Sequence, residues 1–190
     1  SIVGMLLPLL AATFFLRREG LRWSNLIFGR PLSVKQFCMI TVLAIVAAYF
    51  FATLATLLAV RVFGLPPLDV SRFSILEGNL FMYLWFLLPV AWGSAAIGEE
   101  LLMRGFFLHR LRGLAGTYVA VVLQAFLFAI GHFYQGIVGV ISIFMLGMVF
   151  GAVYVRSGGN LVPVIIAHGV IDTFALTAIY LGYGEALQIS

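Results

Sequence analysis

The sequence predicts an all-α fold, a polytopic transmembrane bundle of about six to eight helices with an amphipathic segment at the membrane interface. Hydrophobic residues make up 63% of the 190 positions and charged residues only 9%, whereas a soluble domain is about one quarter charged. Apolar stretches long enough to enter a bilayer also follow one another along the chain. We therefore expect one membrane-embedded domain over residues 1–190, in contact with membrane lipids, with a motif-bearing core at about residues 80–181.

Six apolar stretches give the expected order of the helices. They are Ile2–Leu16, Phe37–Phe63, Leu80–Ile97, Tyr118–Phe133, Ile137–Val155 and Leu161–Leu181. Residues 98–114 continue the third stretch as a helix with a more polar end. Because the combined segment is too long for one straight span, we expect a bend at Pro89, Gly93 or Gly98. The chain starts at Ser1 inside an apolar run, so we expect the first helix to be incomplete.

The connections between the stretches differ in charge. The odd-numbered connections hold nine basic residues: Arg17, Arg18, Arg22, Arg30, Lys35, Arg104, Arg110, Arg112 and Arg156. The even-numbered ones hold Arg61 and Arg72. The positive-inside rule therefore predicts that the odd-numbered connections are cytoplasmic. Because the basic residues lie in short loops, the net charge of +4 does not indicate a nucleic-acid partner.

The first connection, residues 17–35, mixes basic and large apolar side chains. This composition is typical of an amphipathic helix that lies flat at the membrane surface, with its apolar face toward the acyl chains. We therefore expect an interfacial helix on the inner leaflet in this connection.

Six ionisable side chains lie in the apolar stretches or in the helical continuation of the third, where a charge within the membrane costs about 3 kcal/mol and is retained mainly for function. They are Glu99, Glu100, Arg104, His132, His168 and Asp172. Glu100 and Arg104, four residues apart on a helix, can form an ion pair, whereas Glu99 is rotated by about 100° and stays free for chemistry. In the alternative interpretation, both glutamates only pair with the arginine and cap polar neighbours.

The remaining groups repeat the four-residue spacing. His168 and Asp172 share a helix face, so the carboxylate can accept a hydrogen bond and fix the imidazole tautomer; alternatively, the pair only joins helices. Phe128 lies on the face of His132, which can equally be a packing element. With a rise of about 1.5 Å per residue, these groups and Glu99 reach the middle of a hydrocarbon core about 30 Å thick.

A glutamate beside two histidines is suited to amide hydrolysis, because it can activate water while other groups stabilise an oxyanion. The same set, Glu99, His132 and His168, is acceptable for a divalent metal such as zinc, and the sequence leaves metal-bound and metal-free water open. The sequence contains no His-Glu-x-x-His and no Gly-x-Gly-Asp, and Ser94 is not in a Gly-x-Ser-Gly context. These absences argue against other intramembrane protease designs.

Three short motifs follow one another between about residues 80 and 181. Glu99-Glu100-Leu101-Leu102-Met103-Arg104 reads Glu-Glu-x-x-x-Arg, Phe128 to His132 reads Phe-x-x-x-His, and His168 to Asp172 reads His-x-x-x-Asp. In type and order they resemble the motifs of the CAAX protease and bacteriocin-processing (CPBP/Abi) family, whose third motif ends in Asn. The chain is thus similar to type II CAAX prenyl endopeptidases.

The resemblance implies an intramembrane endopeptidase with a cavity open to the cytoplasm. Glu99 would activate water with His132, and His168 with Asp172 would stabilise the oxyanion. The family motif ends in Asn, whereas this chain has Asp172, and an ionised Asp172 would repel an oxyanion. The Asp therefore implies either a protonated Asp172 or a role in orienting His168. The supporting residues would be Glu100, Arg104 and Phe128. The partner would be a membrane-anchored peptide or protein, such as a prenylated CAAX C-terminus.

Two other functional classes stay open. A non-catalytic membrane scaffold or immunity protein of the same family would retain the polar cluster for helix packing. A small proton-coupled transporter would use it as a proton relay. No internal repeat pairs the two halves of the chain, and this argues against the transporter.

Overall fold

The structure is a computed structural model that describes residues 2–184, and all regular elements in this range are helical. They are α1 (Ile2–Arg18), α2 (Trp23–Ile27), α3 (Val34–Arg61), η1 (Ser71–Leu76), α4 (Leu80–Trp85), η2 (Phe86–Glu99), η3 (Leu101–Leu108), α5 (His109–Ala115), α6 (Thr117–Ile130), η4 (Phe133–Gln135), α7 (Gly136–Arg156) and α8 (Val162–Tyr180). The predicted all-α fold class is confirmed.

Four helical segments are long and apolar enough to cross a membrane. They are Val34–Arg61, Leu80–Ala115, Phe133–Arg156 and Val162–Tyr180, while α6 is shorter, with 14 residues. Large hydrophobic side chains such as Phe50, Leu58 and Leu88 are exposed on their outer faces. Lipid tails solvate such a surface and water does not, so the protein is an integral membrane protein.

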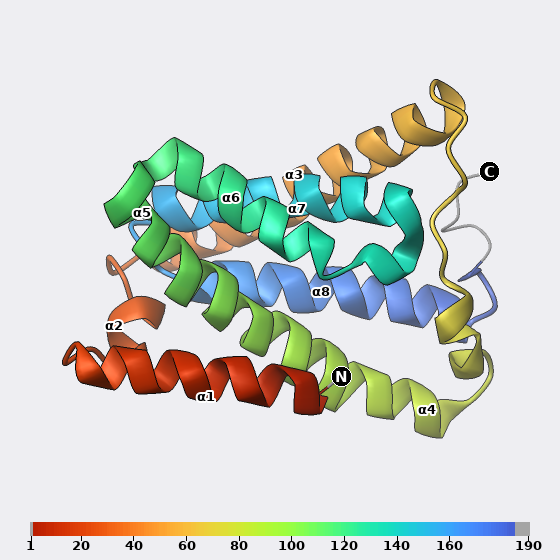
Figure 1. Cartoon of the computed structure of the whole chain (residues 1–190). Helices are drawn as coiled ribbons and strands as arrows, with labels where there is room; N and C mark the ends of the chain where they lie inside the picture. The colour runs from red at the N-terminus through yellow and green to blue at the C-terminus, as the bar shows by residue number, and fades with distance from the viewer. Residues whose placement is uncertain (1, 185–190) are drawn as a thin grey trace.

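Helix α7 packs closely against α6 and α3 in the middle of the bundle (Figure 1). A Cβ atom at Gly147 would lie 3.0 Å from the Cα atom of Ala125 on α6, so a side chain at this position would force the two helices slightly apart. On α3, Ala44 and Ala48 are completely buried. Small residues of this kind let helix backbones pack tightly in lipid, where the hydrophobic effect does not drive helices together.

One continuous helix runs from Leu80 to Ala115 and crosses the bundle diagonally (Figure 1). Between Phe86 and Leu108 it is mostly π-helical, with N–H groups bonded five residues back. The predicted bend does not interrupt the helix, because the wider π-helical turns accommodate Pro89, which has no N–H to donate.

The C-terminal end of α1, helix α5 and the α7–α8 loop lie at one end of the bundle (Figure 1), and these segments with their neighbours carry most of the basic residues of the chain. Arg110 pairs with Glu19 at 2.6 Å, and the Arg30 N–H donates to the Gly158 carbonyl at 3.0 Å. The prediction that Arg104 lies in a connection is wrong, because Arg104 is completely buried within the long helix. Its charge is matched by Glu100, which keeps it inside.

Without Arg104, this basic end holds eight basic residues. They are Arg17, Arg18, Arg22, Arg30, Lys35, Arg110, Arg112 and Arg156. The opposite, less basic end holds Arg61 and Arg72, together with η4 and the C-terminal end of α8 (Figure 1). The charge asymmetry inferred from the sequence is therefore an asymmetry between the two ends of the bundle.

The connection between α1 and α3 contains a shorter helix than predicted, since only Trp23–Ile27 is helical. Leu26 is 3% exposed and packs in one apolar cluster with Leu16 of α1 and Leu102 of η3. The indole N–H of Trp23 donates to Thr13 Oγ1 at 2.9 Å. This segment therefore packs against the bundle with its apolar side chains and does not form an extended interfacial helix.

Candidate active site

The long helix, the turn after α6 and helix α8 supply the ionisable residues of the three motifs. We divide them into an inner cluster and an outer group according to their burial and pairing. The inner cluster is Glu100, Arg104 and His168, and the outer group is Glu99, His132 and Asp172. The inner cluster is buried, whereas each member of the outer group keeps part of its surface exposed.

The inner cluster is centred on one carboxylate oxygen. Glu100 Oε1 accepts a hydrogen bond from Arg104 Nη1 at 2.7 Å and another from His168 Nδ1 at 2.8 Å. Glu100 and Arg104 are 0% exposed, and His168 is 5% exposed. The predicted Glu100–Arg104 pair is confirmed, and His168 joins it from another helix. Because removing one partner leaves a buried charge uncompensated, at a cost of about 3–5 kcal/mol, the cluster fixes α8 to the long helix.

Aromatic rings and a backbone carbonyl enclose the Arg104 guanidinium. Its Cζ atom lies 4.6 Å from the centroid of the Phe128 ring and 5.4 Å from that of Phe150, within the range of cation–π attraction. Arg104 Nη2 donates to the Gly147 carbonyl at 3.3 Å, and Gln124 Nε2 donates to the same oxygen at 2.9 Å. Phe150, Gly147 and Gln124 were missed from the sequence, although Gln124 is the one amide in its apolar stretch and so carried a signal.

The outer group is more open and less tightly bonded. The Asp172 side chain is 30% exposed, and Glu99 and His132 are half-buried. Glu99 lies within electrostatic range of Arg104, His168 and Asp172. Within the described residues, Glu99 forms no ion pair, and its buried Oε2 atom has no hydrogen-bond partner. Glu100 Oε2 also lacks one, but Glu100 is already anchored through Oε1.

The His168–Asp172 pair differs from the expectation. The distance from His168 Nε2 to Asp172 Oδ2 is 3.6 Å, which is too long for a hydrogen bond. Glu100 accepts the short bond instead, and because a carboxylate only accepts, His168 Nδ1 carries the donated proton. Glu100 therefore fixes the tautomer that Asp172 was expected to fix, and His168 Nε2 is directed toward the outer group.

His132 is held by Phe128 in two ways. Its Nδ1 atom lies 2.9 Å from the Phe128 carbonyl oxygen, and the two rings pack edge to face with centroids 4.8 Å apart. A carbonyl only accepts, so Nδ1 is the donor, and Nε2 of the neutral ring keeps its lone pair. The Phe-x-x-x-His spacing thus leaves Nε2 available to a proton or a ligand.

A close contact sets the register of α8 against the long helix beside the site. Trp92 Nε1 donates to Thr173 Oγ1 at 3.1 Å. A Cβ atom at Gly169 would lie 2.7 Å from atoms of the Trp92 ring. The residue next to His168 therefore has to be glycine for α8 to pack here.

The candidate metal ligands Glu99, His132 and His168 do not form a metal site. Across the part of the chain that the structure describes, no three His, Cys, Asp or Glu side chains are grouped so that they could hold an ion. His168 Nδ1 is bonded to Glu100. The donor set in this arrangement therefore does not fit a resident metal.

Two surface hollows, with volumes of about 550 and 320 Å³, lie at the basic end. The first is formed by α1, α2 and their connection, and the second by α2, α5 and the α7–α8 loop. No residue of the inner cluster or the outer group lines either hollow. They therefore belong to a different part of the molecule from the candidate active site.

Comparison with known proteins tests the family indicated by the motifs. Residues 81–174 match the family model described as type II CAAX prenyl endopeptidase Rce1-like. The matched segment runs from α4 into α8 and contains all three motifs, hence the whole inner cluster and outer group. No curated protein and no solved structure matches the chain. Over residues 81–174, the predicted resemblance to type II CAAX prenyl endopeptidases is therefore confirmed.

Proposed function

We propose that the protein is an intramembrane endopeptidase that hydrolyses a peptide bond of a membrane-associated substrate with water activated by Glu99 and His132. The observation that carries the proposal is the arrangement of an open, incompletely paired outer group beside a rigid inner cluster. The family match supports the protease class. Catalytic groups held on a rigid scaffold lower the entropic cost of reaching the transition state.

Glu99 is the base and His132 orients the water. The Glu99 carboxylate takes one water proton, while His132 Nε2 accepts a hydrogen bond from the other O–H. The hydroxide oxygen forms a bond with the scissile carbonyl carbon, and the carbonyl π electrons move to oxygen. When the tetrahedral intermediate collapses, the C–N bond breaks and the proton on Glu99 passes to the leaving amine. Atoms and charge therefore balance with water as the only co-reactant.

His168 stabilises the oxyanion through Nε2. Its Nδ1–H is engaged by Glu100, so only the imidazolium form also donates from Nε2. A donor aimed at the developing negative charge contributes about 3–4 kcal/mol in comparable sites. Asp172 Oδ2 lies 3.6 Å from Nε2 without accepting a hydrogen bond, so Nε2 of the imidazolium keeps its N–H for the substrate carbonyl, and Asp172 favours the imidazolium electrostatically.

The proposed substrates are membrane-anchored peptides, including prenylated C-terminal CAAX sequences. The family match is to prenyl endopeptidases. The bundle also exposes apolar side chains on the site-bearing part of the long helix, such as Ile97, two residues before Glu99. A lipid-modified substrate therefore shares the solvent of the enzyme and can reach the outer group from the bilayer.

We also propose that the site opens to the cytoplasm, as the family resemblance implies. This opening determines how the protein is oriented in the membrane. His132 and Tyr134 follow the C-terminal end of α6 at the less basic end (Figure 1). The Arg72 guanidinium stacks there on Tyr134, 4.9 Å from the ring centroid. The positive-inside rule instead assigns the basic end to the cytoplasm. A cytoplasmic opening beside His132 therefore requires the opposite orientation to the one the basic residues predict.

Single-cysteine labelling decides this orientation. Cys38 is changed to Ser, and one cysteine is introduced by Tyr134→Cys at the less basic end or by Lys35→Cys at the basic end. A membrane-impermeant maleimide is applied to sealed inside-out and right-side-out vesicles. A cytoplasmic site requires labelling at position 134 in inside-out vesicles and at position 35 in right-side-out vesicles. The reverse pattern rejects the cytoplasmic opening.

Peptide cleavage in lipid tests the proposed function. Purified protein and the Glu99→Gln variant are incubated with prenylated CAAX peptides and unmodified membrane peptides, with and without a strong chelator, and the products are identified by mass spectrometry. The proposal predicts cuts by the wild type alone, in the presence and absence of the chelator. Equal cleavage by Glu99→Gln, or none by the folded wild type on the whole pool, contradicts it and favours a scaffold.

A further inference from the structure

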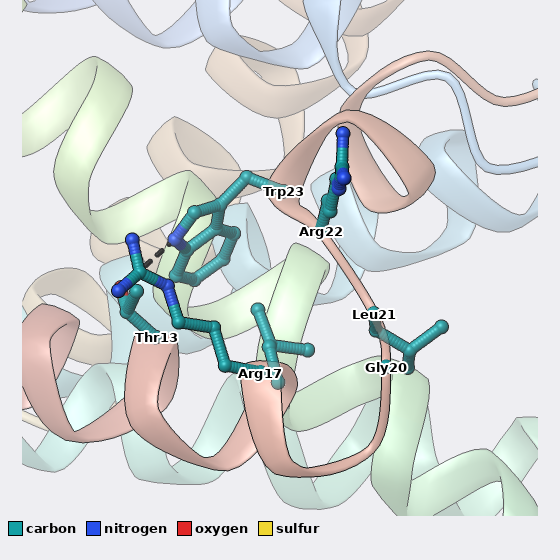
Figure 2. A pocket seen from close by; sticks show the side chains of 7 residues that line it. Thr13, Arg17, Gly20, Leu21, Arg22 and Trp23 are labelled. Atoms are coloured by element: carbon teal, nitrogen blue, oxygen red, sulfur yellow. Dashed lines mark hydrogen bonds between the residues drawn. The ribbon is translucent and has the colours of Figure 1, made fainter.

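A hollow at the basic end takes no part in the proposed reaction, yet it is lined by cationic and amphipathic side chains. It has a volume of about 550 Å³ and lies where α1 ends and α2 begins. Arg17 and Trp23 lie on one side of it and Arg22 on the other (Figure 2). Leu16 and Leu21 add an apolar lining. The hollow thus combines charged donors with an apolar surface.

The two arginines of the hollow have no acidic partner among the described residues, since no carboxylate there pairs with Arg17 or Arg22. The adjacent acid, Glu19, pairs instead with Arg110 at 2.6 Å. Two exposed guanidinium groups with free donors therefore border one hollow, and planar guanidinium forks match phosphate oxygens in geometry and charge.

The surroundings of the hollow indicate a lipid as the source of the phosphate. Helix α1 exposes Leu6, Leu7, Leu10 and Phe14, with between 53% and 70% of each residue accessible. These side chains form an apolar surface on the same helix that carries Arg17 at its C-terminal end. The indole N–H of Trp23 bonds to Thr13, which fixes an aromatic ring of the type enriched at headgroup depth.

We propose that this hollow binds the phosphate headgroup of an anionic membrane phospholipid. Arg17 and Arg22 donate to the phosphate oxygens, and Trp23 packs against the glycerol region. The acyl chains then lie along the exposed apolar surface of α1. Such a lipid would hold the α1–α2 corner at the membrane surface, through clustered basic residues of the kind that recognise anionic leaflets.

Lipid titration of the full chain, followed by native mass spectrometry, tests the site. Delipidated protein is titrated with phosphatidylglycerol and, separately, with phosphatidylcholine. The test variant is Arg17→Gln/Arg22→Gln. The matched control is Arg30→Gln/Arg156→Gln, which removes the same charge from exposed positions at the same end but outside the hollow. Circular dichroism melting establishes that both variants remain folded.

The site predicts that the test variant loses about tenfold in affinity for phosphatidylglycerol, as expected for two charge-assisted contacts, and that the control loses less than about twofold. Phosphatidylcholine binding stays weak in all three proteins. If both variants lose the same affinity for phosphatidylglycerol, the lipid responds only to the overall positive charge of this end, and the proposal is overturned. An unchanged affinity of the test variant also overturns it. Inorganic phosphate is the final arm: displacement of the lipid by about equimolar phosphate indicates a free-anion site and also overturns it.

Discussion

The inner cluster and the outer group each contain one glutamate and one histidine but are built in opposite ways. In the inner cluster, Glu100 Oε1 binds Arg104 at 2.7 Å and His168 at 2.8 Å, with almost no surface exposed. In the outer group, Glu99 forms no ion pair within the described residues, and Asp172 remains 3.6 Å from the nearest imidazole nitrogen. Two adjacent glutamates therefore have different surroundings because the helix directs them to different sides.

Under the proposed function, one short motif, Glu99-Glu100 with Arg104, serves both stability and chemistry. The second glutamate and the arginine compensate each other in a low-dielectric interior, where an unpaired charge is costly. The first glutamate keeps an oxygen without a protein partner, and such a group can bind water or substrate. Changes in the inner cluster should therefore affect folding, whereas changes in the outer group should affect turnover.

The largest expected effect is on the inner cluster. Arg104→Met leaves Glu100 buried and only partly compensated, so we expect a loss of about 3–5 kcal/mol in the free energy of unfolding. Glu100→Gln/Arg104→Met removes both charges and should recover part of that loss. Thermal unfolding in detergent measures both variants. If Arg104→Met is as stable as the wild type, the inner cluster is not needed for stability and the distinction from the outer group fails.

The second effect is on turnover without loss of fold. His132→Gln removes the imidazole to which the proposed function assigns the orientation of water, so we expect cleavage to fall by about 10²-fold or more at an unchanged melting temperature. His109→Gln, at the basic end, serves as the matched control and should retain activity. Peptide cleavage rates in lipid provide the readout. Equal activity of the two variants would exclude His132 from the chemistry.

A third, intermediate effect comes from the contact that aligns α8. Gly169→Ala places a methyl group where atoms of Trp92 lie 2.7 Å away, so we expect a loss of about 1–3 kcal/mol in stability and a matching drop in turnover. Gly169→Ala/Trp92→Leu should restore part of the stability. The control is Gly113→Ala, because a Cβ at Gly113 has no neighbour within 4 Å. Unfolding of the three variants is compared in detergent, and an unaffected Gly169→Ala would contradict the tight packing.

The smallest expected effect is at Asp172. Asp172→Asn keeps the shape and one acceptor oxygen, and it restores the residue of the family motif, so we expect activity within about tenfold of the wild type. Asp172→Leu, which removes every polar atom, should be clearly less active. Cleavage rates of the pair report whether orientation or charge matters. Loss of activity in Asp172→Asn would mean that the carboxylate itself is required.

The helices were largely predictable because apolar length and bilayer thickness determine them. The stretch Phe37–Phe63 became α3, which starts at Val34 because Ser33 and Gln36 form a capping box. The long helix was harder to predict. Pro89 and two glycines indicated a break, whereas the π-helical turns absorb the proline, and no local sequence signal distinguishes these two outcomes.

The site was predictable only where its contacts are local. The Glu100–Arg104 pair follows from a spacing of four residues on one helix. The bond between His168 and Glu100 joins residues 68 positions apart, and it became visible only when α8 was packed against the long helix. The burial of Arg104 was missed for the same reason. Phe128 and Phe150, which enclose it, come from other helices, so the sequence around Arg104 only indicated a charged connection.

The most direct test of the division between the two regions compares Glu99→Gln with Glu100→Gln, which differ by one position and carry the same chemical change. For each variant, the melting temperature in detergent and the rate of peptide cleavage in lipid are measured side by side. We predict that Glu99→Gln melts like the wild type but loses cleavage by about 10²-fold or more, whereas Glu100→Gln is destabilised. A stable, active Glu99→Gln, or a Glu100→Gln as stable as the wild type, would contradict the separation of chemistry from scaffold.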